Sequence, residues 1–213
     1  ATPGVVVSPT VVVVQPRAEA AVPSPAQASE LSPEAVYAKV APSVVVVDSI
    51  DASGRPFARG SGVVTDAQQV VTNCHVVQRA VQIKVHSAGM EYTATSGTSD
   101  TTLDLCMLQV ANLPAAAVAR STMAKLRVGQ TVYAIGAPQG LDQTLSQGLI
   151  SALREMSMGM VIQTSAAISP GSSGGGLFDS QGRLVGITTF QAKTVQNLNF
   201  ALPVDWLDTM RTR

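Results

Sequence analysis

The sequence predicts an all-β fold, and three observations support this. Hydrophobic residues make up 46% of the 213-residue chain but aromatic residues only 4%, so valine and alanine must fill most of the core. The apolar runs are short, and turn residues such as Gly54-Arg55-Pro56 separate them, which is typical of strands joined by tight turns. Residues 81–85 alternate apolar and polar side chains, as a half-buried strand does. The length suits one domain or two closely packed subdomains.

Residues 1–30 differ in composition from the rest of the chain. They combine runs of valine with prolines whose spacing forbids a helix, as in an extended linker. We expect a mobile linker here, and the alternative is that the valine runs add as strands to a sheet edge. A domain over residues 31–213 then begins with a short helix, which Ser32 caps and Pro33 starts.

Strands and turns account for most of the remaining chain. Strands are expected at residues 44–47, 60–65, 81–85, 91–94, 103–110, 131–135, 144–153 (with Gly148 as a candidate bulge), 183–189 and 199–202. The alanine-rich residues 112–120 connect the two halves. Val204, Leu207 and Met210 recur at helical spacing, which predicts a C-terminal helix.

A turn rich in glycine and serine follows an apolar lead-in at residues 166–176. Glycine lets several backbone N–H groups point to one side, where they can stabilise an oxyanion. Ser173 is the candidate nucleophile of this turn. The candidate oxyanion donors are the N–H groups of Gly171 and Ser173, with Ser172 as a further one. A serine is a poor nucleophile by itself, so this chemistry needs a histidine and an acid.

The chain has two histidines. His86 follows the alternating residues 81–85 on their polar face, and we expect an exposed strand residue there. His75 follows the end of an apolar segment and is the candidate base. Asp104 lies in an apolar run, where a carboxylate is costly to bury unless it is paired. Asp104 is therefore the candidate acid that orients His75, and the alternative is a strand residue that faces solvent.

The order His75, Asp104, Ser173 is that of the chymotrypsin-type proteases, and the surrounding residues resemble the HtrA branch of that clan. The matching stretches are residues 60–64, 72–77, 104–108, 134–141, 162–168 and 199–203. The resemblance covers residue 31 to the C-terminus. It implies a double six-stranded antiparallel β-barrel with the site between the barrels, the first at about 43–111 and the second at about 130–203.

The resemblance also implies a serine endopeptidase that acts on polypeptides through an acyl-enzyme. It places the base of the primary specificity pocket at Ala167 and Ile168, neither of which is charged, so cleavage is expected after small or medium aliphatic residues. It places Thr188, Thr189 and Phe190 beside the substrate backbone. The alternatives are a catalytically latent protease fold that acts as a binding or scaffold protein, and an acyl transferase that acts on esters.

The same resemblance implies a periplasmic or secreted protein, a homo-oligomer in some relatives, and a role in protein quality control. The chain departs from the family pattern at Ser165, Ser172 and Gly176, where Asp, Asn and Pro are usual. We expect a protease domain without the PDZ domain of the family. Because Ser172 is not a carboxylate, we expect no activation by pairing with a newly cut N-terminus.

The net charge, the length of the apolar runs and the two cysteines indicate which partners and which cysteine chemistry to expect. The formal net charge is zero, which argues against nucleic acid as a partner, and no apolar run is long enough to span a membrane. We expect no cofactor and no metal. Cys74 and Cys106 lie close in sequence to His75 and Asp104, so a disulfide is one hypothesis and two buried thiols the other.

Overall fold

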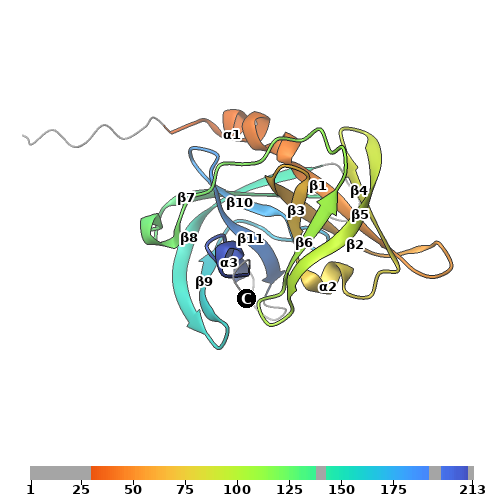
Figure 1. The fold of residues 1–213 in the computed structure, drawn as a ribbon. Coiled ribbons are helices and arrows are strands. Elements are labelled where there is room, and N and C mark those ends of the chain that lie inside the picture. The colour runs from red at the N-terminus through yellow and green to blue at the C-terminus, as the bar shows by residue number, and fades with distance from the viewer. Residues whose placement is uncertain (1–29, 138–142, 192–197, 211–213) are drawn as a thin grey trace, which may run out of the picture.

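The computed structural model describes residues 30–137, 143–191 and 198–210, which form two closed β-barrels side by side (Figure 1). The first barrel comprises β1 (Val44–Ile50), β2 (Pro56–Asp66), β3 (Gln69–Thr72), β4 (Gln82–Ser87), β5 (Met90–Asp100) and β6 (Leu105–Val110). The second comprises β7 (Thr131–Gly136), β8 (Thr144–Met156), β9 (Gly159–Thr164), β10 (Gly176–Asp179), β11 (Leu184–Gln191) and β12 (Asn199–Pro203).

Both barrels have the same topology. Neighbouring strands follow the order β1-β2-β3-β6-β5-β4 in the first barrel and β7-β8-β9-β12-β11-β10 in the second. All these pairs are antiparallel. The predicted double six-stranded barrel is therefore confirmed. The linker predicted for residues 1–30 falls almost wholly outside the described residues.

Three α-helices accompany the barrels in the described part of the chain: α1 (Pro33–Val40), α2 (Cys74–Val77) and α3 (Trp206–Met210). Two short 3-10 helices are η1 (Ala41–Ser43) and η2 (Met123–Lys125). Ser32 caps α1 as predicted, because its Oγ accepts the Ala35 N–H at 3.3 Å. The apolar residues expected on one face of the C-terminal helix, Val204, Leu207 and Met210, are all buried. No helix among the described residues has the length and apolar character that crossing a membrane requires.

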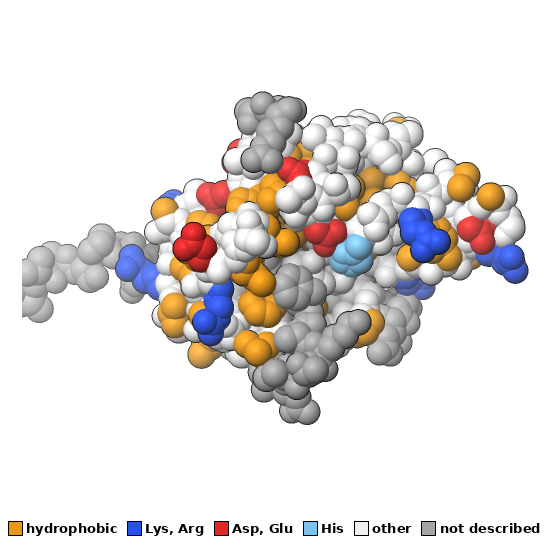
Figure 2. Space-filling model, turned by 90° about the horizontal axis from the view of Figure 1, so that it is seen from below, with side chains coloured by type: hydrophobic (Ala, Val, Ile, Leu, Met, Phe, Trp, Pro, Cys, Tyr) orange, Lys and Arg blue, Asp and Glu red, His pale blue; other side chains and the backbone are white. Residues whose placement is uncertain are grey.

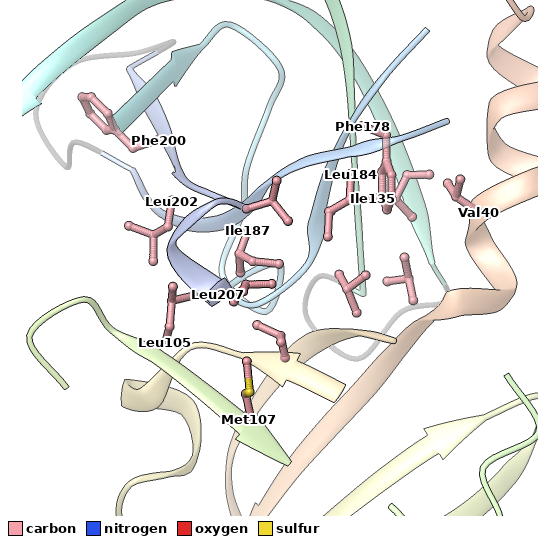
Figure 3. Packing of buried hydrophobic residues seen from close by; sticks show 14 of the residues in the cluster. Val40, Leu105, Met107, Ile135, Phe178, Leu184, Ile187, Phe200, Leu202 and Leu207 are labelled. Carbon is pink, nitrogen blue, oxygen red and sulfur yellow. The ribbon is translucent and has the colours of Figure 1, made fainter. Parts of the chain in front are cut away.

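The hydrophobic core has three parts. Each barrel has a hydrophobic cluster of its own. The third cluster lies between the barrels and joins Leu105 and Met107 of the first barrel to Ile187 and Leu202 of the second (Figure 3). Leu105 directly follows Asp104, and Ile187 directly precedes Thr188. The shared core therefore fixes the strand ends that approach the candidate site from both barrels.

Candidate active site

His75 and Asp104 form a direct pair. His75 Nδ1 lies 2.8 Å from Asp104 Oδ2, and the His75 backbone N–H donates to Asp104 Oδ1 at 2.9 Å. With Nδ1 protonated and bound to the carboxylate, Nε2 is the ring nitrogen left to accept a proton. In the space-filling view, a histidine side chain is exposed beside an acidic one on the face seen there (Figure 2).

Asp104 lies in a turn and not in the strand predicted for residues 103–110, because β6 begins at Leu105. Asp100 Oδ1 accepts the N–H groups of Thr102 and Leu103 at 3.0 Å each, which stabilises the turn after β5. Asp104 itself has a φ of 54°, in the left-handed region that costs a non-glycine residue free energy. This conformation brings the carboxylate to His75.

The backbone of Asp104 is also held in place. Its carbonyl oxygen accepts the side-chain N–H of Asn73 at 2.9 Å and the backbone N–H of Cys74 at 3.2 Å. A disulfide joins Cys74 to Cys106 in β6. The residues next to His75 are thus bound to the residues around Asp104 by hydrogen bonds and by a covalent link.

The Asp104 contact raises the pKa of His75. The hydrogen bond to the carboxylate is the main cause, and charge attraction adds to it. Partial burial of the ring acts in the opposite direction and does not cancel the effect. His75 therefore stays protonated to a higher pH than an isolated histidine, for which the pKa is about 6.5.

Thr189 connects Ser173 to this pair. Ser173 Oγ donates to the Thr189 carbonyl oxygen at 2.7 Å, and Thr189 Oγ1 donates to Asp104 Oδ2 at 3.1 Å. No hydrogen bond among the described residues joins Ser173 Oγ to His75. The three predicted residues share one site, but the serine hydroxyl is bound to a carbonyl of β11.

In the turn that leads to Ser173, no hydrogen bond within the described part of the chain uses the N–H groups of Gly171 and Ser173. The prediction that Ser172 is a further oxyanion donor is wrong for this conformation. Its N–H donates to the Ser169 carbonyl at 2.9 Å, as in a tight turn, and cannot also bind a ligand. Gly171, with a φ of 94°, allows the turn to take this shape.

The residues expected to contact substrate differ in exposure. Of the two at the predicted pocket base, Ala167 is exposed and Ile168 is 4% exposed and packs in the core of the second barrel. Thr188, expected beside the substrate backbone, is 1% exposed. Ala167 and Thr188 line a cavity of about 80 Å³, whose described walls carry no charged side chain. Phe190 belongs to β11, and its side chain lies outside the described residues.

Asp48, to which no sequence pattern pointed, pairs with His86 on another part of the first barrel. Asp48 is 4% exposed, lies 3.0 Å from His86 Nε2, and accepts two hydrogen bonds from Arg59 at 2.5 and 2.6 Å. Burial raises the pKa of Asp48, but the bonds and charges of Arg59 and His86 outweigh it, so that the pKa is lowered. His86 is therefore a half-buried strand residue paired with Asp48, and the prediction of an exposed residue is wrong.

Comparison with known proteins places the chain among proteases. It matches the family model of the trypsin-like peptidase domain over residues 60–187. It is 36% identical over 208 residues to Protease Do-like 1, chloroplastic, of Arabidopsis thaliana (86% of this chain, 47% of that protein). It is 42% identical over 144 residues to periplasmic serine endoprotease DegP of Escherichia coli strain K12 (62% of this chain, 30% of that protein).

Solved structures agree with these relatives. The serine endoprotease from Yersinia pestis matches with a TM-score of 0.76 at 32% identity, over 85% of this chain and 66% of that one. The chain spans less than half the length of both curated relatives named above.

Proposed function

The chain belongs to the trypsin-like peptidase domain family, and we propose that it is a serine endopeptidase that cleaves peptide bonds through an acyl-enzyme on Ser173. The observation that carries this proposal is the His75–Asp104 pair, with Ser173 linked to the same carboxylate through Thr189. A serine protease function is common to the bacterial relatives, and the assignment of roles to residues is our own.

The first step requires the Ser173 hydroxyl to leave the Thr189 carbonyl and turn to His75. Ser173 Oγ then bonds to the substrate carbonyl carbon, its proton passes to His75 Nε2, and the carbonyl π pair moves onto oxygen. Collapse of this intermediate breaks the C–N bond, and His75 returns the proton to the leaving amine. Water repeats the sequence to release the acid.

Asp104 and the Ser173 turn stabilise the charges that form in this step. Asp104 accepts from Nδ1 and offsets the positive charge of the imidazolium ring. The N–H groups of Gly171 and Ser173 donate to the developing oxyanion, and one such donor is worth about 10²–10³ in rate.

We propose cleavage after small or medium aliphatic residues such as alanine or valine. The support is the uncharged lining at Ala167 and the small volume of the cavity beside it, about 80 Å³. A pocket without a carboxylate has no group that would favour lysine or arginine.

We also propose a periplasmic or extracellular location and a role in protein quality control there. The Cys74–Cys106 disulfide supports an oxidising compartment, and the DegP relative is named as periplasmic. The substrates are polypeptides, and assembly into a homo-oligomer is part of the same proposal.

Hydrolysis of unfolded casein and of peptide p-nitroanilides tests this function. We expect the wild-type protein to cleave casein and Ala- or Val-terminated p-nitroanilides, and Ser173→Ala to fold but cleave neither. Equal cleavage by Ser173→Ala, or a strong preference for Lys- and Arg-terminated substrates, would contradict the respective part of the proposal.

One observation favours a second function, that of a latent protease fold which binds other proteins. Ser173 donates to Thr189 and not to His75, a state in which the nucleophile is not activated. A folded wild-type protein that binds casein but never cleaves it would support this alternative.

A further inference from the structure

Two buried hydroxyl groups hold the turn that carries Ser173, and we propose that they position its oxyanion donors. They belong to Ser61 in β2, which is 0% exposed, and to Thr188 in β11, which is 1% exposed. We refer to Ser61 and Thr188 as the hydroxyl clamp. The inference rests on the proposed function, because it assigns both residues a positioning role in the same reaction.

Thr188 fixes the peptide group between Ser172 and Ser173. Its Oγ1 donates to the Ser172 carbonyl oxygen at 2.6 Å, and the Gly175 N–H donates to the same oxygen at 2.9 Å. In a trans peptide the C=O and N–H groups point in opposite directions. The two bonds therefore direct the Ser173 N–H away from Thr188, and no partner within the described residues occupies it.

Ser61 fixes the peptide groups on both sides of the one that Thr188 holds. Its Oγ donates to the Gly171 carbonyl oxygen at 2.9 Å and accepts the Ala137 N–H at 2.9 Å, and its own N–H donates to the Ser173 carbonyl oxygen at 2.8 Å. The Gly171–Ser172 peptide is thus bound at its oxygen by the first barrel. Its N–H is bound by Ser169 in the second.

The turn needs such external bonds because its own backbone is permissive. Gly171 and Gly174 have φ values of 94° and 86°, and glycine passes between conformations at little steric cost. A rotated peptide would present a carbonyl oxygen to the substrate in place of an N–H. Loss of a clamp hydroxyl should therefore affect the transition state, in which the oxyanion forms, more than substrate binding.

The experiment compares four variants with the wild-type protein. Thr188→Val removes the hydroxyl at nearly constant volume, Thr188→Ser keeps it, and Ser61→Ala removes the other hydroxyl. Ser43→Ala is the matched control, since Ser43 is 5% exposed and its Oγ donates to the Ala116 carbonyl at 2.5 Å, outside the turn. The readouts are kcat and KM on a Val-terminated peptide p-nitroanilide, inhibition by a peptide trifluoromethyl ketone, and Tm.

We expect Thr188→Val and Ser61→Ala to lower kcat by about 10–10²-fold, below the loss of a direct donor, with little change in KM. Affinity for the ketone, which forms an oxyanion on the serine, should fall in parallel. Thr188→Ser should keep most of the wild-type kcat, and Ser43→Ala should lower only Tm.

A Thr188→Val variant with wild-type kcat and ketone affinity, in an active enzyme, would overturn the hydroxyl clamp alone. The clamp would also be wrong if Ser43→Ala or Thr188→Ser lost as much kcat as Thr188→Val does. Absence of turnover in the wild-type protein would overturn both the clamp and the proposed function.

Discussion

At the scale of single residues, Asp104 has the most demanding position in the site. Its carboxylate accepts from the His75 ring, the His75 backbone and the Thr189 hydroxyl, and its carbonyl accepts from Asn73 and Cys74. These bonds offset the cost of a left-handed backbone at a non-glycine residue. The surroundings therefore keep Asp104 in the conformation that orients the histidine.

Replacement of Asp104 tests this role through rate and pH together. Asp104→Asn should lower the rate of acylation by about 10⁴-fold at neutral pH, because the histidine loses its orienting acceptor. Since the carboxylate raises the pKa of His75, the wild-type rate should rise with a midpoint above about 6.5, the ordinary value for histidine, and the variant midpoint should lie lower.

The measurement is the second-order rate of fluorophosphonate labelling between pH 5 and 9 (roughly spanning the histidine range), and Thr189→Val is the comparison. Thr189→Val removes one hydrogen bond to the Asp104 carboxylate but leaves the carboxylate charged. The labelling rate should therefore fall much less in Thr189→Val than in Asp104→Asn. If the pH midpoint of the labelling rate is the same in Asp104→Asn as in the wild-type protein, the carboxylate does not raise the pKa of His75.

At the scale of elements, the disulfide links α2 to β6 across 32 positions of sequence. Closing a loop of that size stabilises a protein by roughly 2–4 kcal/mol, mainly by restricting the unfolded chain. The hydrogen bond from the Cys74 N–H to the Asp104 carbonyl is made by the backbone and does not need the sulfur atoms.

The double variant Cys74→Ala/Cys106→Ala should therefore lower Tm by roughly 5–15 °C, the shift that 2–4 kcal/mol implies for a domain of this size. Labelling of Ser173 well below the new Tm should persist. Thermal unfolding followed by circular dichroism, with reduced wild-type protein as the control, measures the change. An unchanged Tm would mean that the link does not stabilise the domain.

Gly148 in β8 shows how closely two backbones approach in the second barrel. A Cβ atom at this position would overlap the backbone nitrogen and Cα of Ala166, which cannot move as the end of a side chain can. The sequence suggested a bulge at this glycine, but the structure has its register shift between Ile150 and Ala152. Gly148 is thus explained by close packing.

Gly148→Ala should lower the free energy of unfolding by roughly 1–3 kcal/mol, as overpacking does. Urea unfolding measures the loss. Gly89→Ala is the control for steric overlap, because no atom lies within 4 Å of a Cβ at that position. The φ of 76° at Gly89 adds backbone strain of its own in that variant. A Gly148→Ala protein of wild-type stability would contradict the close approach of the Ala166 backbone.

At the scale of the whole molecule, the site depends on two barrels that share a core. His75 and Asp104 come from the first barrel, Ser173 and Thr189 from the second, and the hydrophobic cluster around Leu105 and Ile187 lies between them (Figure 3). Ser61 also crosses this boundary through its bonds to the Ser173 turn. Any change that separates the barrels should therefore disable the site before it unfolds either one.

The sequence could predict a feature where the residue types themselves point to it, or where several stretches match a known family. With two histidines in the chain, His75 could be selected, and the resemblance implied the double barrel. The sequence could not predict that Asp104 lies in a turn, because an apolar run looks the same whether or not its first residues join the strand. Nor could it predict the contacts of Ser61 and Thr188, which depend on how distant strands meet in three dimensions.

Fluorophosphonate labelling, followed by mass spectrometry of the peptide that carries residues 166–176, tests directly whether Ser173 is an activated nucleophile. We expect one adduct on Ser173 in the wild-type protein, greatly reduced labelling in His75→Ala, and none in Ser173→Ala, with all three proteins folded. An adduct on another residue, or a folded wild-type protein that does not react, would contradict the assignment of Ser173 as that nucleophile.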